Sequence, residues 1–413
     1  MKIAHFPGSF LPTMGGAEII VHNLATEQAN AGHTVHVIAH QKSRKFFEDI
    51  KIQLPYQIKY PISNSFGLAC RLRKLGLPFN WIITKQIKWL QNKYHYDLWH
   101  FNLINEYAFI IVPFLKQLGV PVIGTFRGSD IQLCSEVDYG FRLDRNFDNE
   151  IHNIIGLFDT VTAISQSVKD EYKKLGVSEI NIQLIPNGID INRINMIKVN
   201  KNVARKKFGL PTNKKIILTV GRNHPKKGYI HIPSIIKYLN NKIDFIWVII
   251  GKDCANIMER AKILGVNSKL IIKDEIAAKI NFNSKVEVPS DDLIMAYKSA
   301  DVFCFPTIIE TFGNVFLEAM VAGLPIITTN APGPRDIITN EYNGLISAIN
   351  DNKTMSDNII RVLNNKSLRK SLVENGIQDV KKYNWDKVTK DYEKVYVNTA
   401  KMVENILLND EEN

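Results

Sequence analysis

Cysteine is scarce in this sequence, and the few cysteines form none of the common functional patterns. The four of them, among 413 residues, are Cys70, Cys134, Cys254 and Cys304, and no Cys-x-x-Cys pair occurs. Disulfide frameworks and redox motifs need closely spaced cysteines in recognisable patterns. We therefore expect a reduced, cytoplasmic setting in which the thiols serve as small core residues.

Long apolar runs are also missing. The longest candidate, residues 107–126, is interrupted by Lys116 and Gln117, and its Gly119 and Pro121 predict a turn between a helix and a strand. Near the N-terminus, the run from Lys2 ends at Pro7-Gly8, before the apolar core of about seven residues that a signal peptide needs. We expect neither a membrane span nor a signal peptide, and only the tail 409–413 to fray.

Acidic residues are absent from residues 51–96, in a chain whose formal net charge is +11. The basic residues of this stretch are Lys51, Lys59, Arg71, Arg73, Lys74, Lys85, Lys88 and Lys93, interleaved with Phe66, Phe79, Trp81, Trp89 and Tyr94. Basic residues mixed with aromatics are typical of proteins that bind an anionic bilayer surface, where each cation contributes about 1 kcal/mol to the binding free energy. The alternative is a solvated surface above core aromatics. No recognised motif supports nucleic-acid binding.

What the sequence does contain is the alternation of strands and helices typical of α/β proteins. Residues 3–38 read as strand, glycine loop, helix and strand, and the same rhythm restarts at strand 215–221, loop 222–228, helix 230–239 and strand 245–251. The length suits two domains of roughly 200 residues each. The pattern predicts two successive α/β modules with parallel sheets, joined by a polar linker over 192–207, with the ligand in the cleft between them.

The glycine loops exclude two common nucleotide-binding classes. The first loop, residues 8–16, does not fit the G-x-G-x-x-G pattern of nicotinamide dehydrogenases, and the chain has no Walker lysine motif. Both classes are therefore disfavoured.

The segment 305–320 carries the strongest functional signal. Glu310 and Glu318 lie eight positions apart, around a glycine and the expected start of a helix near Asn314. The free N–H groups and positive dipole end of that helix would attract a phosphate. Glu318, about one turn into the helix, is placed to accept two ribose hydroxyls, and Glu310 in the loop is placed to bind sugar hydroxyls.

These glutamates resemble the Glu-x7-Glu signature of the family-four retaining glycosyltransferases, whose GT-B architecture has two Rossmann-like domains. Further matching motifs follow in the right order: Gly15-Gly16-Ala17-Glu18, Pro186-Asn187-Gly188-Ile189-Asp190, Gly221-Arg222, Lys226-Lys227-Gly228, Ala322-Gly323-Leu324-Pro325, Asn343-Gly344 and Asn384-Trp385 with Tyr392 and Tyr396. The resemblance covers Lys2 to about Tyr396. It implies an acceptor-binding domain over 1–195, a nucleotide-sugar-binding domain over 196–384, and a helix over 385–413 that packs back on the first domain.

The resemblance also implies the reaction and its residues. A sugar would move with retention from a nucleoside-diphosphate sugar, most commonly a UDP-sugar, to a lipid-linked or oligosaccharide acceptor in envelope polysaccharide or glycolipid assembly, at the inner face of the cytoplasmic membrane. The implied catalytic residues are Arg222, Lys227, Glu310, Asp130 and Arg127. The implied donor-binding residues are Gly16, Arg222, Lys227, Glu310, Phe312, Gly313, Asn314, Val315 and Glu318.

Arg222 and Lys227 are suited to the charge that builds on the leaving diphosphate. Together with the helix start near Asn314, they would stabilise that charge without a metal ion. The sequence has no apolar-flanked Asp-x-Asp that would hold a divalent ion on a diphosphate. We therefore expect neither a metal nor another cofactor.

Two departures from the family pattern stand out. In the segment 124–130, Arg127 occupies the histidine position of the family's His-Gly-x-Asp loop, while Asp130 remains to orient the site. Arginine stays protonated and is no general base, so Arg127 would hold an anionic donor or acceptor group, or assist the diphosphate. The stretch 266–289 is longer and more polar than the family's usual connection, and Val286 to Pro289 are expected to line the base pocket.

Two other functions remain open. A nucleotide-sugar 2-epimerase shares the architecture and works without an acceptor. A catalytically inactive, membrane-associated subunit is favoured only by Arg127, and the intact Arg222, Lys227, Glu310 and Glu318 argue against it. Taken singly, these residues also fit ordinary loop charges and helix caps.

Overall fold

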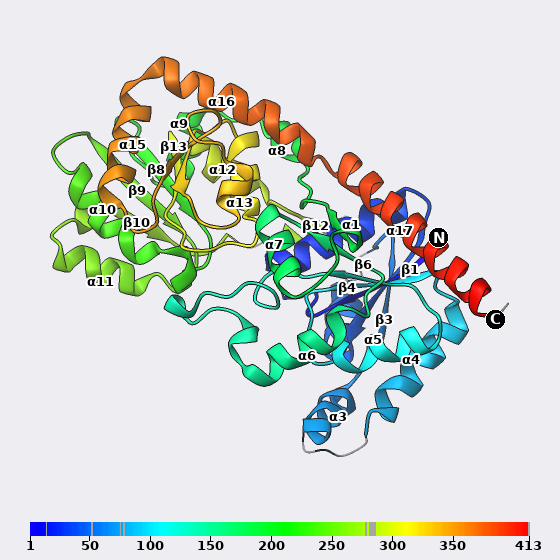
Figure 1. The fold of residues 1–413 in the computed structure, drawn as a ribbon. Helices are drawn as coiled ribbons and strands as arrows, with labels where there is room; N and C mark the ends of the chain where they lie inside the picture. Colours follow the sequence, from blue (N-terminus) through cyan, green and yellow to red (C-terminus); the bar gives the residue numbers. More distant parts are fainter. Residues whose placement is uncertain are drawn as a thin grey trace. The chain divides into compact units, whose positions relative to one another are not determined.

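The computed structural model describes residues 1–13, 15–50, 53–74, 76, 79–276, 279–280 and 286–411, and the chain forms two compact units (Figure 1). The first unit consists mainly of Met1–Gly188 and Trp385–Asn413. The second consists of Ile189–Lys279 and Glu287–Asn384. Each unit is built on its own parallel sheet, as the sequence predicts.

The first unit contains a seven-stranded sheet in the order β3-β2-β1-β4-β5-β6-β7. Every pair of neighbouring strands is parallel. The strands are β1 (Lys2–Pro7), β2 (Thr34–His40), β3 (Gln57–Ile62), β4 (Leu98–Asn102), β5 (Val122–Thr125), β6 (Thr160–Ala163) and β7 (Ile182–Leu184). The order reverses between β1 and β4, which makes the sheet doubly wound and marks its carboxyl edge as the expected place for ligands.

Eight α-helices belong to the described part of this unit. They are α1 (Gly16–Asn30), α2 (Arg44–Ile50), α3 (Asn64–Lys74), α4 (Trp81–Tyr94), α5 (Ala108–Gln117), α6 (Arg145–Ile155), α7 (Gln166–Lys174) and α17 (Trp385–Glu411). The predicted helix-to-strand turn at Gly119 and Pro121 is confirmed, because α5 ends just before it and β5 begins just after it. The first predicted helix is α1, and Gly32 follows its end with a φ of 92°.

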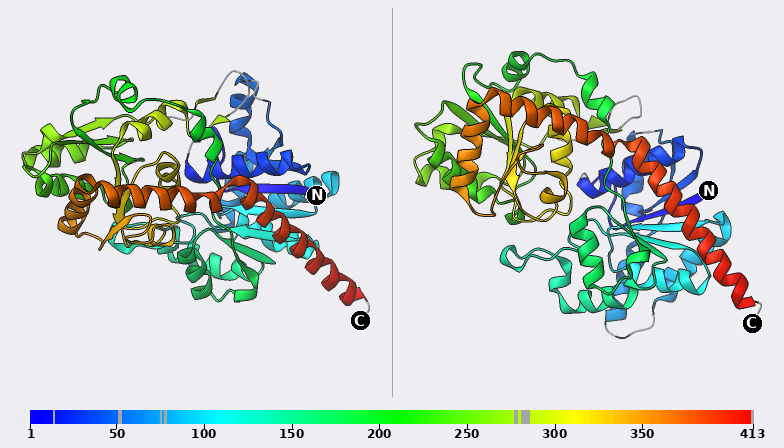
Figure 2. Two further views of the ribbon diagram at one scale, coloured as in Figure 1. Left: turned by 90° about the horizontal axis from the view of Figure 1, so that it is seen from above. Right: turned by 45° about the horizontal axis from the view of Figure 1, so that its top comes forward.

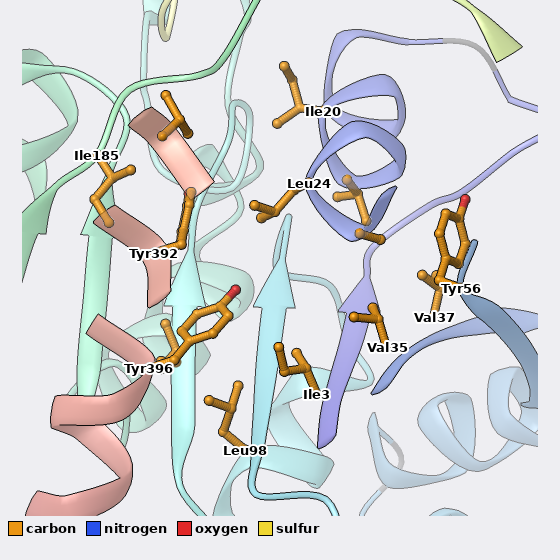
Figure 3. Close-up of a cluster of buried hydrophobic side chains, with 14 of the residues drawn as sticks. Ile3, Ile20, Leu24, Val35, Val37, Tyr56, Leu98, Ile185, Tyr392 and Tyr396 are labelled. Carbon is orange, nitrogen blue, oxygen red and sulfur yellow. The ribbon is translucent and has the colours of Figure 1, made fainter. Parts of the chain in front are cut away.

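The C-terminal helix α17 packs on the first unit. Figure 3 shows Tyr392 and Tyr396 of α17 in one apolar cluster with Ile3 of β1 and Leu24 of α1. All four side chains are buried. Both views in Figure 2 show α17, orange to red, running past the N-terminus of the chain. The prediction that the last helix returns to the first domain is thereby confirmed.

The second unit contains a six-stranded parallel sheet in the order β10-β9-β8-β13-β14-β15. Its strands are β8 (Lys215–Val220), β9 (Phe245–Ile250), β10 (Leu270–Lys273), β13 (Val302–Phe305), β14 (Ile326–Thr329) and β15 (Leu345–Ser347). Outside both sheets, β11 (Lys279–Ile280) pairs with β12 (Val286–Glu287), and Ile280 and Val286 are grouped with the first unit. The helices are α8 (Ile191–Met196), α9 (Lys201–Lys207), α10 (Ile232–Leu239), α11 (Ala255–Ile263), α12 (Asp291–Ser299), α13 (Asn314–Val321), α14 (Pro334–Ile337), α15 (Asn352–Asn364) and α16 (Lys366–Val380).

The segment 192–207, predicted as a linker, is instead folded into the second unit as α8 and α9. Arg205 on α9 is buried, and its guanidinium lies 2.5 Å from the Asp301 carboxylate just before β13. The same side chain donates to the Ser299 carbonyl oxygen at 2.9 Å. One of the basic residues that suggested a linker, Arg205, therefore holds α9 against the sheet through these contacts.

The expectation that the thiols serve as core residues holds for three of the four cysteines, because Cys134 is only partly buried. Cys70, Cys254 and Cys304 are buried, and all four cysteines are free. No helix in the described ranges combines the length and apolarity needed to cross a bilayer.

Candidate functional site

The loop between β13 and α13 forms the centre of the candidate site in the second unit. As predicted, α13 begins at Asn314. Gly313, at the N-cap position, has a φ of 101°, and a Cβ atom there would lie 2.6 Å from the Phe316 ring. Only glycine fits this left-handed position without strain. Glycine has no side chain, so no side chain at the N-cap position caps this helix.

Glu310, in this loop, forms ion pairs with two lysines. Its carboxylate lies 2.8 Å from Lys227 Nζ and 3.3 Å from Lys226 Nζ, and the residue is only 8% exposed. Burial alone would raise the pKa of Glu310, but the two ammonium groups outweigh it and lower the pKa to about 2. Burial lowers the pKa of Lys227, and the Glu310 carboxylate opposes that shift. With both lysines protonated, the cluster carries one net positive charge.

The turn that carries these lysines is fixed to the Glu310 loop through the backbone. The Lys226 carbonyl oxygen accepts hydrogen bonds from Ile308 N at 2.8 Å, Ile309 N at 3.2 Å and Thr307 Oγ1 at 3.0 Å. Gly228 closes the turn with a φ of 63°, and a Cβ atom on it would collide with the Pro306 carbonyl oxygen. The placement of the lysines beside Glu310 therefore depends on close backbone contact.

Arg222 lies at the same carboxyl edge of the second sheet, two residues after the end of β8. Its side chain is exposed, and Gly221 before it has a φ of 134°. Tyr229 Oη donates to the Gly221 carbonyl oxygen at 3.1 Å, which fixes the backbone that leads to the arginine. Burial lowers the pKa of the neighbouring His224, and the charges of Lys226 and Arg222 lower it further. The edge is thus strongly cationic.

Glu318, one turn into α13, is held by a tyrosine that the sequence did not predict. Tyr297 Oη on α12 donates to Glu318 Oε2 at 2.6 Å. Burial raises the pKa of Glu318 to about 7, although this hydrogen bond opposes the shift. No local motif marks Tyr297, because the contact arises from the packing of α12 against α13. Among the other predicted donor residues, Phe312 is buried against Tyr383, with ring centroids 5.8 Å apart.

The glycine loop of the first unit lies at the carboxyl end of β1. Gly16 is the first residue of α1, and Gly15 precedes it at the N-cap position. The side chain of Ser9 donates to the buried Glu18 carboxylate, which also lies where a Cβ atom of Gly15 would be. Met14, part of the predicted loop, lies outside the described residues.

Asp130 fixes the loop that follows β5. Its carboxylate accepts backbone hydrogen bonds from Ile104 N at 2.8 Å, Gly128 N at 2.8 Å and Arg127 N at 3.0 Å. Burial raises the pKa of Asp130 to about 6, against the opposing effect of these bonds. Both oxygens of the carboxylate therefore hold the backbone of this loop.

Arg127 projects from this loop among amide side chains. Its Nε and Nη2 donate to Asn102 Oδ1 at 3.1 and 2.7 Å, and its Nη1 donates to Asn187 Oδ1 at 2.9 Å. Arg127 is 7% exposed. Asn102 was not predicted from the sequence, although its position at the end of β4 matches that of Arg127 just beyond β5.

The predicted residues therefore fall into two groups, each described within its own unit. Lys227, Glu310, Glu318 and the N-terminus of α13 lie in the second unit, with Arg222 at the same sheet edge. Arg127, Asp130 and Gly16 lie in the first. The expected base-pocket stretch 286–289 begins with β12, and residues 281–285 before it lie outside the described ranges. In the part of the chain that the structure describes, no group of three or more His, Cys, Asp or Glu side chains is arranged for a metal ion.

Two family models match most of the chain. The model described as Glycosyl transferases group 1 matches residues 200–379, and the model described as Glycosyltransferase Family 4 matches residues 14–193. An uncharacterized glycosyltransferase of Methanocaldococcus jannaschii, MJ1607, is 28% identical over 96% of this chain and 98% of its own length. The UDP-Gal:alpha-D-GlcNAc-diphosphoundecaprenol alpha-1,3-galactosyltransferase of Escherichia coli is 28% identical over 55% of this chain and 57% of its own.

Solved structures show the same fold. The crystal structure of Anabaena HepE in complex with UDP and glucose matches this chain with a TM-score of 0.74. The match covers 96% of this chain and 100% of that one, at 17% sequence identity.

Proposed function

The chain belongs to family 4 of the glycosyltransferases and has their GT-B architecture, and from this premise we propose that it is a retaining enzyme using a UDP-sugar. The acceptor is a lipid-linked or oligosaccharide glycan of an envelope polysaccharide or glycolipid. The uridine donor is supported by the UDP in the Anabaena structure. The acceptor class is supported by the diphosphoundecaprenol-linked sugar in the name of the Escherichia coli relative.

The observation that carries this proposal is the cationic edge of the second unit. Lys226 and Lys227 pair with Glu310 at 3.3 and 2.8 Å, and Arg222 and the start of α13 lie at the same ends of the strands. Negative charge grows on the diphosphate as the sugar leaves, and fixed donors that face this charge lower the barrier. The cluster therefore has the charge and rigidity that diphosphate departure requires.

We assign the remaining residues the roles that the family resemblance implies. The Glu318 carboxylate, oriented by Tyr297, accepts the ribose hydroxyls, and Glu310 accepts hydroxyls of the transferred sugar. The leaving phosphate itself takes the acceptor proton, so the reaction needs no histidine base where Arg127 stands.

The experiment for this proposal is a donor screen carried out without metal. Purified protein is incubated with UDP- and GDP-sugars in EDTA, and release of the nucleoside diphosphate is followed. We expect slow release from one UDP-sugar, at a rate that added magnesium or manganese leaves unchanged within about twofold, because the lysines and Arg222 supply the countercharge.

Three outcomes would contradict the proposal. Release that disappears in EDTA and returns with magnesium would contradict metal independence. Conversion of the donor to a 2-epimer without net transfer would favour the epimerase. In addition, the product of a retaining enzyme has the same anomeric configuration as its donor, so an inverted product would exclude the retaining mechanism.

We also propose that the first unit contacts an anionic membrane through the α3–α4 surface, defined as the exposed residues Leu68, Arg71, Trp81, Lys85, Lys88, Trp89 and Lys93. Trp81 is 58% exposed and Trp89 is 52% exposed, while Ile83, Ile87 and Leu90 face the core. Phe66 from the same stretch is a core residue, and Arg73 is paired with Glu150 at 2.6 Å. Lys51 and the side chain of Lys74 lie outside the described residues.

A vesicle-binding measurement tests this surface. The double variant Trp81→Ala, Trp89→Ala should bind phosphatidylglycerol-containing vesicles about tenfold more weakly, because both indoles insert at the headgroup level. Ile180→Ala is the matched control, since Ile180 is an apolar residue of the first unit that is 81% exposed elsewhere. Equal binding by all three proteins, or equal binding to neutral phosphatidylcholine vesicles, would contradict the membrane proposal.

A further inference from the structure

Arg127 carries a buried positive charge that no carboxylate neutralises. The residue is 7% exposed, and it forms no ion pair with any residue that the structure describes. The closest candidate, Asp130, directs both carboxylate oxygens at backbone N–H groups. Burying an unpaired charge is costly, so such groups usually have a partner of opposite charge. Among the described residues that partner is missing.

The guanidinium retains unused hydrogen-bonding capacity. Arginine has five N–H donors in a planar fork. Three of these bonds go to neutral amide oxygens, two to Asn102 and one to Asn187. Within the described residues, one N–H on Nη1 and one on Nη2 make no further bond. Two N–H groups on neighbouring nitrogens match the two oxygens of a carboxylate or phosphate.

The surroundings keep this charge unneutralised and fix its position. His5 Nε2 lies 2.7 Å from Gln28 Oε1, and its Nδ1 lies 3.2 Å from the Asn102 amide nitrogen. Burial, with a smaller contribution from the charge of Arg127, lowers the pKa of His5 to about 4 against the opposing hydrogen bond from Gln28, so this ring is neutral at physiological pH. The amide that receives two of the arginine's bonds is therefore itself held from the opposite side. A positioned cation of this kind is preorganised for an anion.

We propose that Arg127 binds a carboxylate or phosphate group of a substrate other than the donor diphosphate, carried either by the acceptor or by the transferred sugar. This inference rests on the proposed function. The diphosphate already has its own cations, Lys226 and Lys227, in the second unit. Arg127 belongs to the first unit, at the carboxyl edge of its sheet, where an acidic acceptor or a uronic-acid sugar would meet it. The residue thus sets a substrate class: acidic rather than neutral sugars.

Two variants separate loss of this charge from loss of folding. Arg127→Gln removes the cation. Asn187→Asp places a carboxylate 2.9 Å from Nη1 of Arg127. This carboxylate neutralises the charge of Arg127 within the protein, and the guanidinium still has a hydrogen-bond acceptor at position 187. Both should weaken anion binding about tenfold or more, the usual loss for one charge-assisted pair. Arg127→Gln removes the two hydrogen bonds that Arg127 donates to Asn102 Oδ1, and this loss could unfold the loop. Asn187→Asp keeps these two bonds, so it still tests the inference if Arg127→Gln does not fold.

The test measures binding by calorimetry on the full chain. In one arm, the protein loaded with UDP is titrated with glucose 6-phosphate, glucuronate and, as the neutral control, glucose. In the other arm, the free protein is titrated with UDP-glucuronate and UDP-glucose. An anion on the acceptor predicts that the free acids bind and glucose does not. An anion on the transferred sugar predicts that UDP-glucuronate binds more tightly than UDP-glucose. Either preference must disappear in both variants.

Two results would overturn the inference. The first is equal binding of acidic and neutral compounds in both arms. The second is a loss of affinity for UDP itself in Arg127→Gln that equals the loss for the acidic compounds, because Arg127 would then belong to the diphosphate site. Failure of the proposed function has a different signature, since the wild-type protein would then bind neither UDP nor any UDP-sugar.

Discussion

Lys227→Ala is expected to lower kcat for sugar transfer by about 10²–10³-fold, with a much smaller effect on KM. Lys227 Nζ lies 2.8 Å from Glu310, in the loop that leads to α13. Its charge opposes the negative charge that grows on the diphosphate only as the bond to the sugar breaks, so the loss appears mainly in kcat. A single preorganised donor at such a position contributes on this order. The measurement is steady-state release of UDP from the donor identified in the screen.

Lys237→Ala is the matched control for this variant. Lys237 is an exposed lysine on α10 of the same unit, so its removal changes the net charge equally. It should leave kcat within about twofold, as surface charges away from a site usually do. Thermal unfolding of both variants checks that the Glu310 loop remains folded. A Lys227→Ala enzyme with full kcat would remove this lysine from the mechanism.

Gly228→Ala is expected to destabilise the second unit by about 3 kcal/mol and to abolish most of the activity. Gly228 has a φ of 63°, and a methyl group on it would collide with the Pro306 carbonyl oxygen. The left-handed conformation alone costs an alanine about 1 kcal/mol, and the backbone collision adds strain. To relieve that collision, the turn that carries Lys226 and Lys227 must move away from the loop that carries Glu310.

Gly265→Ala separates the two contributions to this effect. Gly265 has a φ of 67°, but no atom lies within 4 Å of the point where a Cβ atom on it would stand. This variant should lose about 1 kcal/mol and retain activity, because it has the conformational cost without the collision. Urea denaturation gives the difference in the free energy of unfolding. Equal losses of unfolding free energy in the two variants would show that the contact between the turn of Lys226 and Lys227 and the loop 306–310 does not contribute to stability.

The sequence predicted the elements whose signals are local. The alternation of apolar strands with helices is confirmed by both parallel sheets, and α13 begins at the predicted Asn314 because strand, glycine and helix follow one another directly. The prediction for 192–207 was wrong. The basic surface of this segment looked like a linker, but Arg205 is buried against Asp301, which stands 96 positions further along the chain. The composition of a short segment cannot reveal an ion-pair partner that lies so far along the sequence.

The same limit explains which site residues were missed. Lys227 and Glu310 were singled out from motifs, but their ion pair joins positions 83 apart. Asn102 and Tyr297 belong to no motif, and they meet Arg127 and Glu318 only because β4 neighbours β5 and α12 packs on α13. Strand order and helix packing decide these contacts. Of these two residues, Asn102 could have been predicted more easily from the sequence, because polar residues at the carboxyl ends of neighbouring parallel strands lie close together.

The most direct test of the central claim is calorimetric titration of UDP into the wild-type protein and Lys227→Ala, both in EDTA. The claim is that the cationic edge formed by Arg222, Lys226, Lys227 and the start of α13 binds a nucleoside diphosphate without metal. It predicts one UDP site per chain in the wild type and binding at least about tenfold weaker in Lys227→Ala. Absence of UDP and GDP binding in the wild type, or equal affinity in the two proteins, would contradict it.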